Sequence, residues 1–124
     1  MGNDTYGILI DPKTYKAELI EFDEGYVNLK TMRNVLRCDY VEYDKLTDEL
    51  DIWVDEEGLI NGSADRNGMF SVSDADGERL GQVAYAGRGL ILTSLKIGDE
   101  EYPMGMTGKR AMQVLNSLNI GTLI

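Results

Sequence analysis

The chain contains no histidine, one cysteine and only two prolines among its 124 residues. Histidine is the commonest general base and a frequent ligand of transition metals, so its absence argues against zinc enzymes and against hydrolases with a Ser-His or Cys-His pair. Cys38 cannot form an internal disulfide and has no histidine to activate it. We therefore interpret Cys38 as an inert, buried thiol, and we expect no catalytic residues, no metal site and no cofactor.

Long apolar runs are also missing. No segment approaches the roughly 20 apolar residues that a membrane helix needs, and the first residues lack the basic start and apolar stretch of a secretory signal. Together with the missing disulfide, these features predict a soluble protein of the cytoplasm, with no membrane partner. The length fits a single domain spanning residues 1–124.

Basic residues are scarce, because 12 Lys and Arg face 22 Asp and Glu and leave a net charge of −10. This charge repels nucleic acids and anionic membranes and attracts basic partners, although it also serves solubility. The acidity is local: residues 1–60 carry 15 acids and 6 bases, whereas residues 61–124 carry 7 acids and 6 bases. Between Asp39 and Glu57 there are nine acids and only one base, Lys45.

Short elements cover most of the chain. Residues 6–10 and 15–22 predict an opening hairpin around Asp11-Pro12, and further strands are predicted at 40–43, 50–54, 58–60, 69–72, 79–85 and 90–95. Asn28 and Thr107 can each cap a helix with apolar residues at helical spacing, and Pro12 and Pro103 are expected in turns. The pattern predicts an α+β fold: a twisted, mainly antiparallel β-sheet with one or two short helices packed on it. The C-terminal part, 97–124, would hold the second helix and an apolar tail, 119–124. That tail either adds a last strand or docks on another subunit of a homodimer or higher homo-oligomer.

Acids and aromatic residues alternate within the acidic run, a composition that suits a surface recognising a protein with a basic face. The partner-binding residues predicted from this pattern are Asp39, Tyr40, Glu42, Tyr43, Asp44, Asp48, Glu49, Asp51 and Trp53. The alternative is a solvated surface whose aromatic residues pack a core or form cross-strand pairs. The spacing of Asp48, Glu49 and Asp51 matches no metal-binding loop.

A second candidate site lies at the start of the predicted C-terminal helix. Backbone N–H groups at a helix start, together with two cations, could receive a phosphate group. The residues of this alternative ligand site are Arg88, Thr107, Gly108, Lys109 and Arg110. Two glycines separated by only two residues, and Arg110 directly after Lys109, exclude a Walker motif. The simpler interpretation is a helix cap with exposed basic residues.

The segment from Trp53 to Gly62, then Asn67, and then Leu80 to Gly87 resemble a family of small uncharacterised proteins of bacteriophages and Gram-positive bacteria, known as a domain of unknown function. The shared order is an N-terminal strand that ends near Asp11-Pro12, a short helix, an acidic Glu-Glu-Gly turn with Asn-Gly soon after it, and a late Gly-x-Val strand, covering most of residues 6–96. The chain departs from the family's Pro-x-Asn-Arg stretch, having Ser63-Ala64-Asp65-Arg66-Asn67 instead. The resemblance implies an accessory protein of a phage or mobile element, acting in the host cytoplasm.

Three functions follow from these observations. The first is a non-enzymatic acidic protein that docks on a basic surface of a host protein as an inhibitor or adaptor, in the manner of a nucleic-acid mimic. The second is an oligomeric sponge that sequesters a nucleotide-like signalling molecule. The third is a carboxylate-dependent hydrolase that uses the acids at Asp55-Glu56-Glu57.

Overall fold

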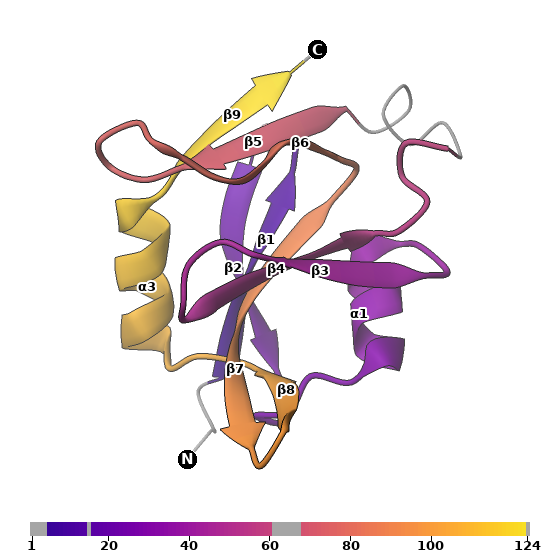
Figure 1. The fold of residues 1–124 in the computed structure, drawn as a ribbon, viewed down its shortest axis with the longest axis vertical. Coiled ribbons are helices and arrows are strands. Elements are labelled where there is room, and N and C mark those ends of the chain that lie inside the picture. Colours follow the sequence, from indigo (N-terminus) through magenta and orange to yellow (C-terminus); the bar gives the residue numbers. More distant parts are fainter. Residues whose placement is uncertain (1–4, 15, 61–67, 124) are drawn as a thin grey trace.

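The computed structural model describes residues 5–14, 16–60 and 68–123. Within them the chain folds into two antiparallel sheets and two helices (Figure 1). The larger sheet has the order β2-β1-β7-β4-β3, and β8 extends it by pairing with the outer half of β7. Its strands are β1 (Thr5–Asp11), β2 (Lys16–Phe22), β3 (Val41–Lys45), β4 (Leu50–Asp55), β7 (Gly89–Ile97) and β8 (Glu100–Met104). The smaller sheet has the order β6-β5-β9 and consists of β5 (Met69–Ser73), β6 (Arg79–Ala86) and β9 (Asn119–Leu123).

Both helices begin at the predicted caps. The Asn28 side chain accepts the backbone N–H of Thr31 at 2.9 Å and starts α1 (Leu29–Leu36), which ends at Arg37 in the left-handed conformation. Thr107 accepts the N–H of Arg110 at 3.1 Å and starts α3 (Gly108–Ser117). Such caps supply partners for N–H groups that the first helical turn leaves unpaired. Neither helix in the described ranges has the length and apolarity needed to cross a bilayer.

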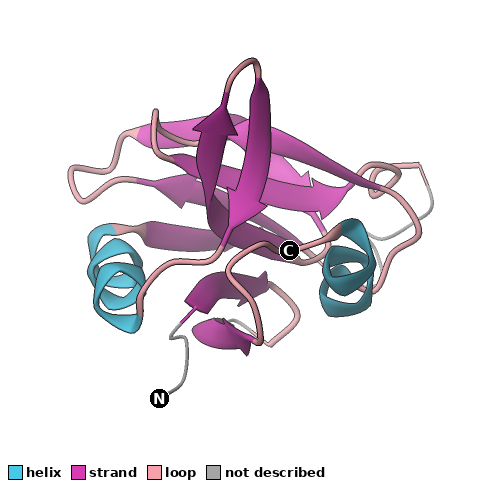
Figure 2. Cartoon of the chain, turned by 90° about the horizontal axis from the view of Figure 1, so that it is seen from below, coloured by secondary structure: helices cyan, strands magenta, loops and turns pink. Residues whose placement is uncertain are grey.

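The larger sheet is covered on both faces, and its central strand β7 shows why. Successive side chains of a strand point to opposite faces, so Ile91 enters one core while Leu90 and Leu92 enter the other. The first core contains α3 and the smaller sheet, represented by Val114 and Phe70. The second core contains α1, and the two helices lie at opposite sides of the molecule (Figures 1 and 2).

The α+β fold class is confirmed, with two differences in detail and one alternative decided. Gly58–Ile60 belongs to a turn after β4, so the strand predicted there is wrong. Pro103 lies inside β8, where no strand was predicted; β8 borders β7 by its pairing, and an edge strand tolerates a residue without an N–H. The apolar tail forms β9 as far as Leu123 and pairs with β5. The Asn-Gly pair at 61–62 and the residues 63–67 lie outside the described ranges.

Candidate functional site

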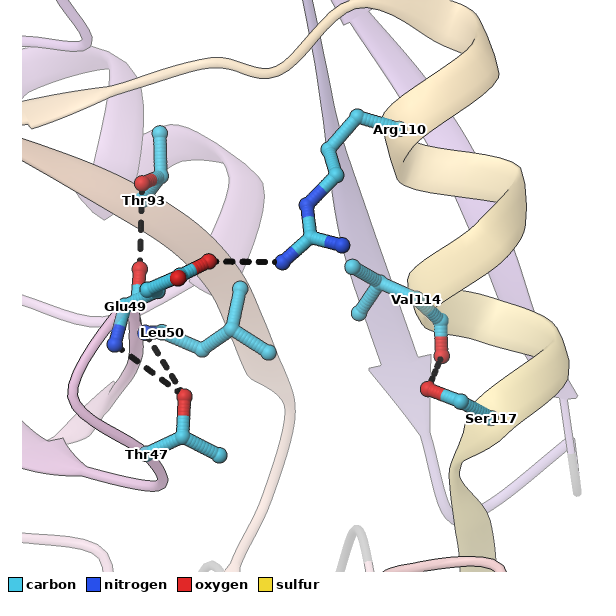
Figure 3. Close-up of polar contacts among 7 residues, drawn as sticks. All are labelled: Thr47, Glu49, Leu50, Thr93, Arg110, Val114 and Ser117. Carbon is cyan, nitrogen blue, oxygen red and sulfur yellow. Dashed lines mark hydrogen bonds and ion pairs between the residues drawn. The ribbon is translucent and has the colours of Figure 1, made fainter.

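The β3–β4 hairpin carries most of the acidic run and forms an outer edge of the larger sheet. Its turn is built by Thr47, whose Oγ1 accepts the N–H groups of Glu49 at 3.2 Å and Leu50 at 3.1 Å (Figure 3). The Thr93 hydroxyl donates to the carbonyl oxygen of Glu49 at 3.0 Å and fastens this turn to β7 (Figure 3). The acidic hairpin is therefore anchored to the central strand.

The strand register separates the hairpin's side chains into two groups. Tyr43 pairs with Trp53 and Lys45 with Asp51, so these four residues share one face of the sheet, which we call the aromatic side. Asp44, one residue along, points to the opposite face, which carries the buried Ile52. The sequence pattern placed all these residues in one surface, whereas the strand period divides them between two.

Two rings dominate the aromatic side. Tyr43 and Trp53 lie with their ring centroids 5.1 Å apart and their planes inclined by 37°, a common cross-strand aromatic contact. Tyr43 remains 51% exposed and nearby Tyr40 is 56% exposed, while Trp53 packs partly against the α1 core. Tyr40 and Tyr43 are therefore accessible to a partner, whereas Trp53 is half-buried and belongs partly to the core.

Asp51 lies inside the molecule although it was predicted to contact a partner. The residue is 3% exposed, and its Oδ1 lies 3.2 Å from Lys45 Nζ, which also approaches Glu101 at 3.7 Å. Burial raises the pKa of the Asp51 carboxyl, Lys45 opposes this effect, and Glu101 reinforces it. The Lys45 ammonium group therefore holds the buried carboxylate in an ion pair and offsets part of the cost of burying its charge.

A small pocket opens beside Asp51 on the aromatic side. It has a volume of about 50 Å³ and is lined by Tyr43, Asp51, Trp53, Ser94, Glu101, Tyr102 and Pro103. Two buried polar atoms belong to lining residues: Asp51 Oδ1 is held by its ion pair with Lys45, and Trp53 Nε1 has no hydrogen-bond partner in the described structure. Leaving a buried donor such as the Trp53 N–H without an acceptor costs about 1–3 kcal/mol.

Asp44 is also engaged internally. Its Oδ2 accepts the hydroxyl of Tyr85 at 2.6 Å, and the same Tyr85 oxygen accepts the N–H of Gln82 at 2.9 Å. Burial raises the pKa of Tyr85, and the bond to Asp44 raises it further. Asp44 therefore joins β3 to β6 of the smaller sheet and is not available as an exposed contact.

The two candidate sites predicted from the sequence meet at one ion pair. Arg110, from the start of α3, donates to the carboxylate of Glu49 in the β3–β4 turn at 2.9 Å (Figure 3). Arg110 was predicted to contact a phosphate group and Glu49 to contact a partner. Each side chain thus already neutralises the other, whereas the exposed Lys109, also on α3, makes no ion pair with any described residue.

Arg88 is not part of that arrangement. It donates to the carbonyl oxygen of Val35 at 3.0 Å and to the carboxylate of Asp11 at 3.3 Å, and so ties α1 to the end of β1. Gly108 at the start of α3 lies against the ring of Tyr6, near the beginning of the same strand. Five residues of extended chain span about 17 Å, so Arg88 and α3 approach opposite ends of β1.

Cys38 follows α1 and is partly buried, with its thiol donating to the carbonyl oxygen of Tyr40 at 3.5 Å. Burial raises the pKa of the thiol to about 11, and the neighbouring charges of Asp55 and Asp39 add to the effect. The nucleophilic form is the thiolate, so this environment matches the interpretation of an inert thiol.

The remaining predicted acids form the accessible part of the run. Asp39, Glu42 and Asp48 are exposed and make no ion pair with any described residue. Asp55 accepts the N–H of Glu57 at 2.9 Å within the turn after β4, where Glu56 and Glu57 point to solvent. Among the described residues no group of three or more His, Cys, Asp or Glu is arranged to hold a metal ion.

Sequence reasoning missed the contribution of β7 and β8 to the aromatic side. Ser94, Glu101 and Tyr102 reach the pocket because β7 lies between β4 and β8 and pairs with both. The local signal, Glu-Glu-Tyr-Pro-Met, contains a proline and two acids, which are typical of a loop. Only the long-range pairing brings these residues beside Asp51.

Comparison with known protein families places the chain in one of them. Residues 5–105 match the family described as Domain of unknown function (DUF3846), and the chain belongs to this family. The matched part runs from β1 through β8 and includes the whole aromatic side and its pocket. No curated protein and no solved structure matches the chain.

Proposed function

We propose that this member of the DUF3846 family is a non-enzymatic binding protein that docks the β3–β4 edge of its larger sheet on a basic surface of a partner protein. The observation that carries the proposal is the combination of half-exposed Tyr40 and Tyr43 with unpaired acids at Asp39, Glu42 and Asp48. Aromatic anchors within a charged rim are typical of protein interfaces, and the acids would steer a basic partner during encounter.

The biological setting of the proposal is an accessory protein of a phage or mobile element that inhibits or adapts a host protein in the cytoplasm. A surface rich in carboxylates imitates the charge of a nucleic-acid backbone, so the partner's basic surface would be a nucleic-acid channel. Asp44 and Asp51 are excluded from the docking surface because both are held internally. The docking surface is therefore the exposed edge along β3, with Tyr43 on the aromatic side and Glu42 on the opposite face. It also includes Asp39, Tyr40 and Asp48, with Glu49 shared with Arg110.

The alternative functions lack a comparable geometry. A nucleotide sponge would need its cations to converge, but Arg110 is paired with Glu49 and Arg88 with Asp11. A carboxylate-dependent hydrolase would need two acids facing a common substrate, but Asp55 accepts a backbone N–H of its own turn.

The test is affinity capture from a lysate of the producing cell, at low and at high salt. A triple variant with Asp39→Asn, Glu42→Gln and Asp48→Asn removes three exposed charges from the docking edge. Its matched control, Glu18→Gln, Glu21→Gln and Asp23→Asn, removes the same charge in and just after β2, at the opposite edge of the larger sheet. We expect the docking variant to lose a partner that the control retains and that high salt releases. Equal capture by both variants would contradict the proposal.

A further inference from the structure

The register of β3 shows which of its backbone groups face away from the sheet. All five residues of β3 pair with β4 without a shift, and hydrogen-bonded and non-hydrogen-bonded pairs alternate along an antiparallel ladder. Just before β3, Tyr40 accepts the N–H of Glu56 at 2.9 Å. Just after β3, Leu46 donates to the carbonyl oxygen of Leu50 at 2.9 Å. The even-numbered residues of β3 therefore bond to β4, and the odd-numbered residues turn their backbone groups to the open edge.

The outward-facing groups belong to Val41, Tyr43 and Lys45. β3 pairs with β4 alone, and no described residue forms a hydrogen bond with the backbone of these three residues. β3 contains no proline and no bulge, which are two common means of keeping further strands from an edge. Its backbone is therefore a template for one more strand.

The side chains of β3 determine which strand can pair there. Directly opposite residues of an antiparallel pair share a face, and opposite charges at such positions stabilise the pair whereas like charges destabilise it. One face of β3 presents the carboxylates of Glu42, which is exposed, and Asp44. The aromatic side presents Val41 and the half-exposed Tyr43. The strand that fits best alternates basic residues, opposite the acids, with apolar residues.

A second copy of this chain does not meet that requirement. If two β3 strands paired antiparallel about Tyr43, Glu42 of each copy would lie opposite Asp44 of the other. Like charges at directly opposite positions are destabilising, and the exposed Asp39 and Asp48 would add to the repulsion between the copies. The charge of this edge therefore favours a different protein with a basic strand over self-association.

We propose that β3 receives an extended segment of the partner protein, with alternating basic and apolar residues, as an additional antiparallel strand of the larger sheet. This inference rests on the proposed docking function and states the form of the partner. Main-chain hydrogen bonds hold the added strand, and its alternate side chains give specificity. The two alternations are linked. The apolar residues, opposite Val41, Tyr43 and Lys45, exchange the hydrogen bonds with β3, whereas the basic residues, opposite Glu42 and Asp44, turn their backbone groups away.

The test is calorimetric titration of the full protein with a peptide in which four lysines alternate with four valines. Two variants of equal charge carry N-methyl groups, one on its valines and the other on its lysines. We expect the unmodified and the lysine-methylated peptides to bind, and the valine-methylated peptide to bind at least about tenfold more weakly, because it loses several hydrogen bonds to β3. A peptide with the lysines and valines in two separate blocks controls for charge and should also bind more weakly. Equal binding by the two methylated peptides, or no binding of the unmodified one, overturns the inference.

Amide hydrogen exchange, followed by NMR, locates the added strand. In the free protein the N–H of Tyr43 should exchange faster than those of Glu42 and Asp44, which bond to β4. The unmodified peptide should slow exchange at Val41, Tyr43 and Lys45 by at least about tenfold. Unchanged exchange there, or protection of β2 at the opposite edge of the sheet instead, contradicts the inference. The outcomes are separable: failure of the peptide with intact charge-dependent capture removes the strand pairing alone, and strand pairing without charge-dependent capture removes the docking function alone.

Discussion

At the scale of single residues, the hydroxyl of Tyr85 shows how one group fixes two sheets. It donates to Asp44 on β3 and accepts from Gln82 in its own strand β6. The backbone passes so close that a Cβ at Gly81 would stand 2.1 Å from the Tyr85 hydroxyl oxygen, and Gly81 has a φ of +70°. Both facts require glycine at this position.

Replacing Tyr85 with Phe leaves Asp44 and the Gln82 N–H without their partner. We expect the free energy of unfolding to fall by about 1–3 kcal/mol, because Tyr85 is buried and Asp44 is charged. Urea unfolding measures this change, and Tyr40→Phe at an exposed tyrosine is the matched control.

The pKa of Tyr85 is raised in the fold above its ordinary value of 10.0, so the stabilisation is complete below pH 10 and declines as the pH rises beyond it. The difference between the two proteins should therefore narrow in alkaline solution. Equal stability of Tyr85→Phe and the parent at neutral pH would contradict this role.

The acidic run shows what the sequence could not predict at the scale of single residues. Tyr40, Glu42 and Asp48 are exposed as their chemistry suggests. Asp44 and Asp51 look identical to them in the sequence, yet Asp44 is bonded to the distant Tyr85, and Asp51 is buried against Lys45, its cross-strand neighbour in the hairpin. Acidic residues are rarely buried without a partner, and the spacing of the acids alone does not reveal which of them has one.

At the scale of elements, the helix caps were the most predictable feature. Asn28 and Thr107 act through side chains that reach only three residues along the chain, so the local sequence contains the whole interaction. Strand β8 was not predictable for the opposite reason. Its acids and Pro103 argue for a loop, and only the unpaired outer half of β7 makes it a strand.

The contact between the β3–β4 turn and α3 is an ion pair of two exposed side chains. Glu49 and Arg110 are 73% and 47% exposed, so water and salt weaken their attraction. A double-mutant cycle with Glu49→Gln and Arg110→Gln should give a coupling energy of about 0.2–1 kcal/mol. The control cycle combines Arg110→Gln with Glu57→Gln, an exposed acid that makes no ion pair among the described residues, and should give a coupling near zero. A coupling as small as that of the control would show that the pair does not hold the turn against α3.

At the scale of the whole molecule, pairing between distant strands determines the architecture. β7 pairs with β1, β4 and β8, and β9 returns to pair with β5. Alternation within each strand predicted the strands themselves but not these partners, so the sequence indicated one sheet where the chain forms two. The position of the candidate site depends on this order, because it leaves the acidic β3 at an edge of the larger sheet.

The net charge of −10 gives stability and binding opposite dependences on salt. In the folded chain the acids are held close together, so their mutual repulsion opposes folding, and salt screens that repulsion. We expect the free energy of unfolding, measured in urea because urea adds no charge, to increase as NaCl rises from about 10 mM to about 500 mM, over which the screening length shrinks from about 30 Å to below 10 Å. The triple variant of the docking edge and its β2 control each remove three charges, so the stability of both should depend less on salt.

Partner capture should instead weaken over the same range of salt, because screening removes the attraction between the acids and a basic surface. If stability and capture both fall as salt rises, the release of the partner reflects unfolding of this chain. If stability rises while capture is lost, the acidic run has a role in recognition beyond solubility.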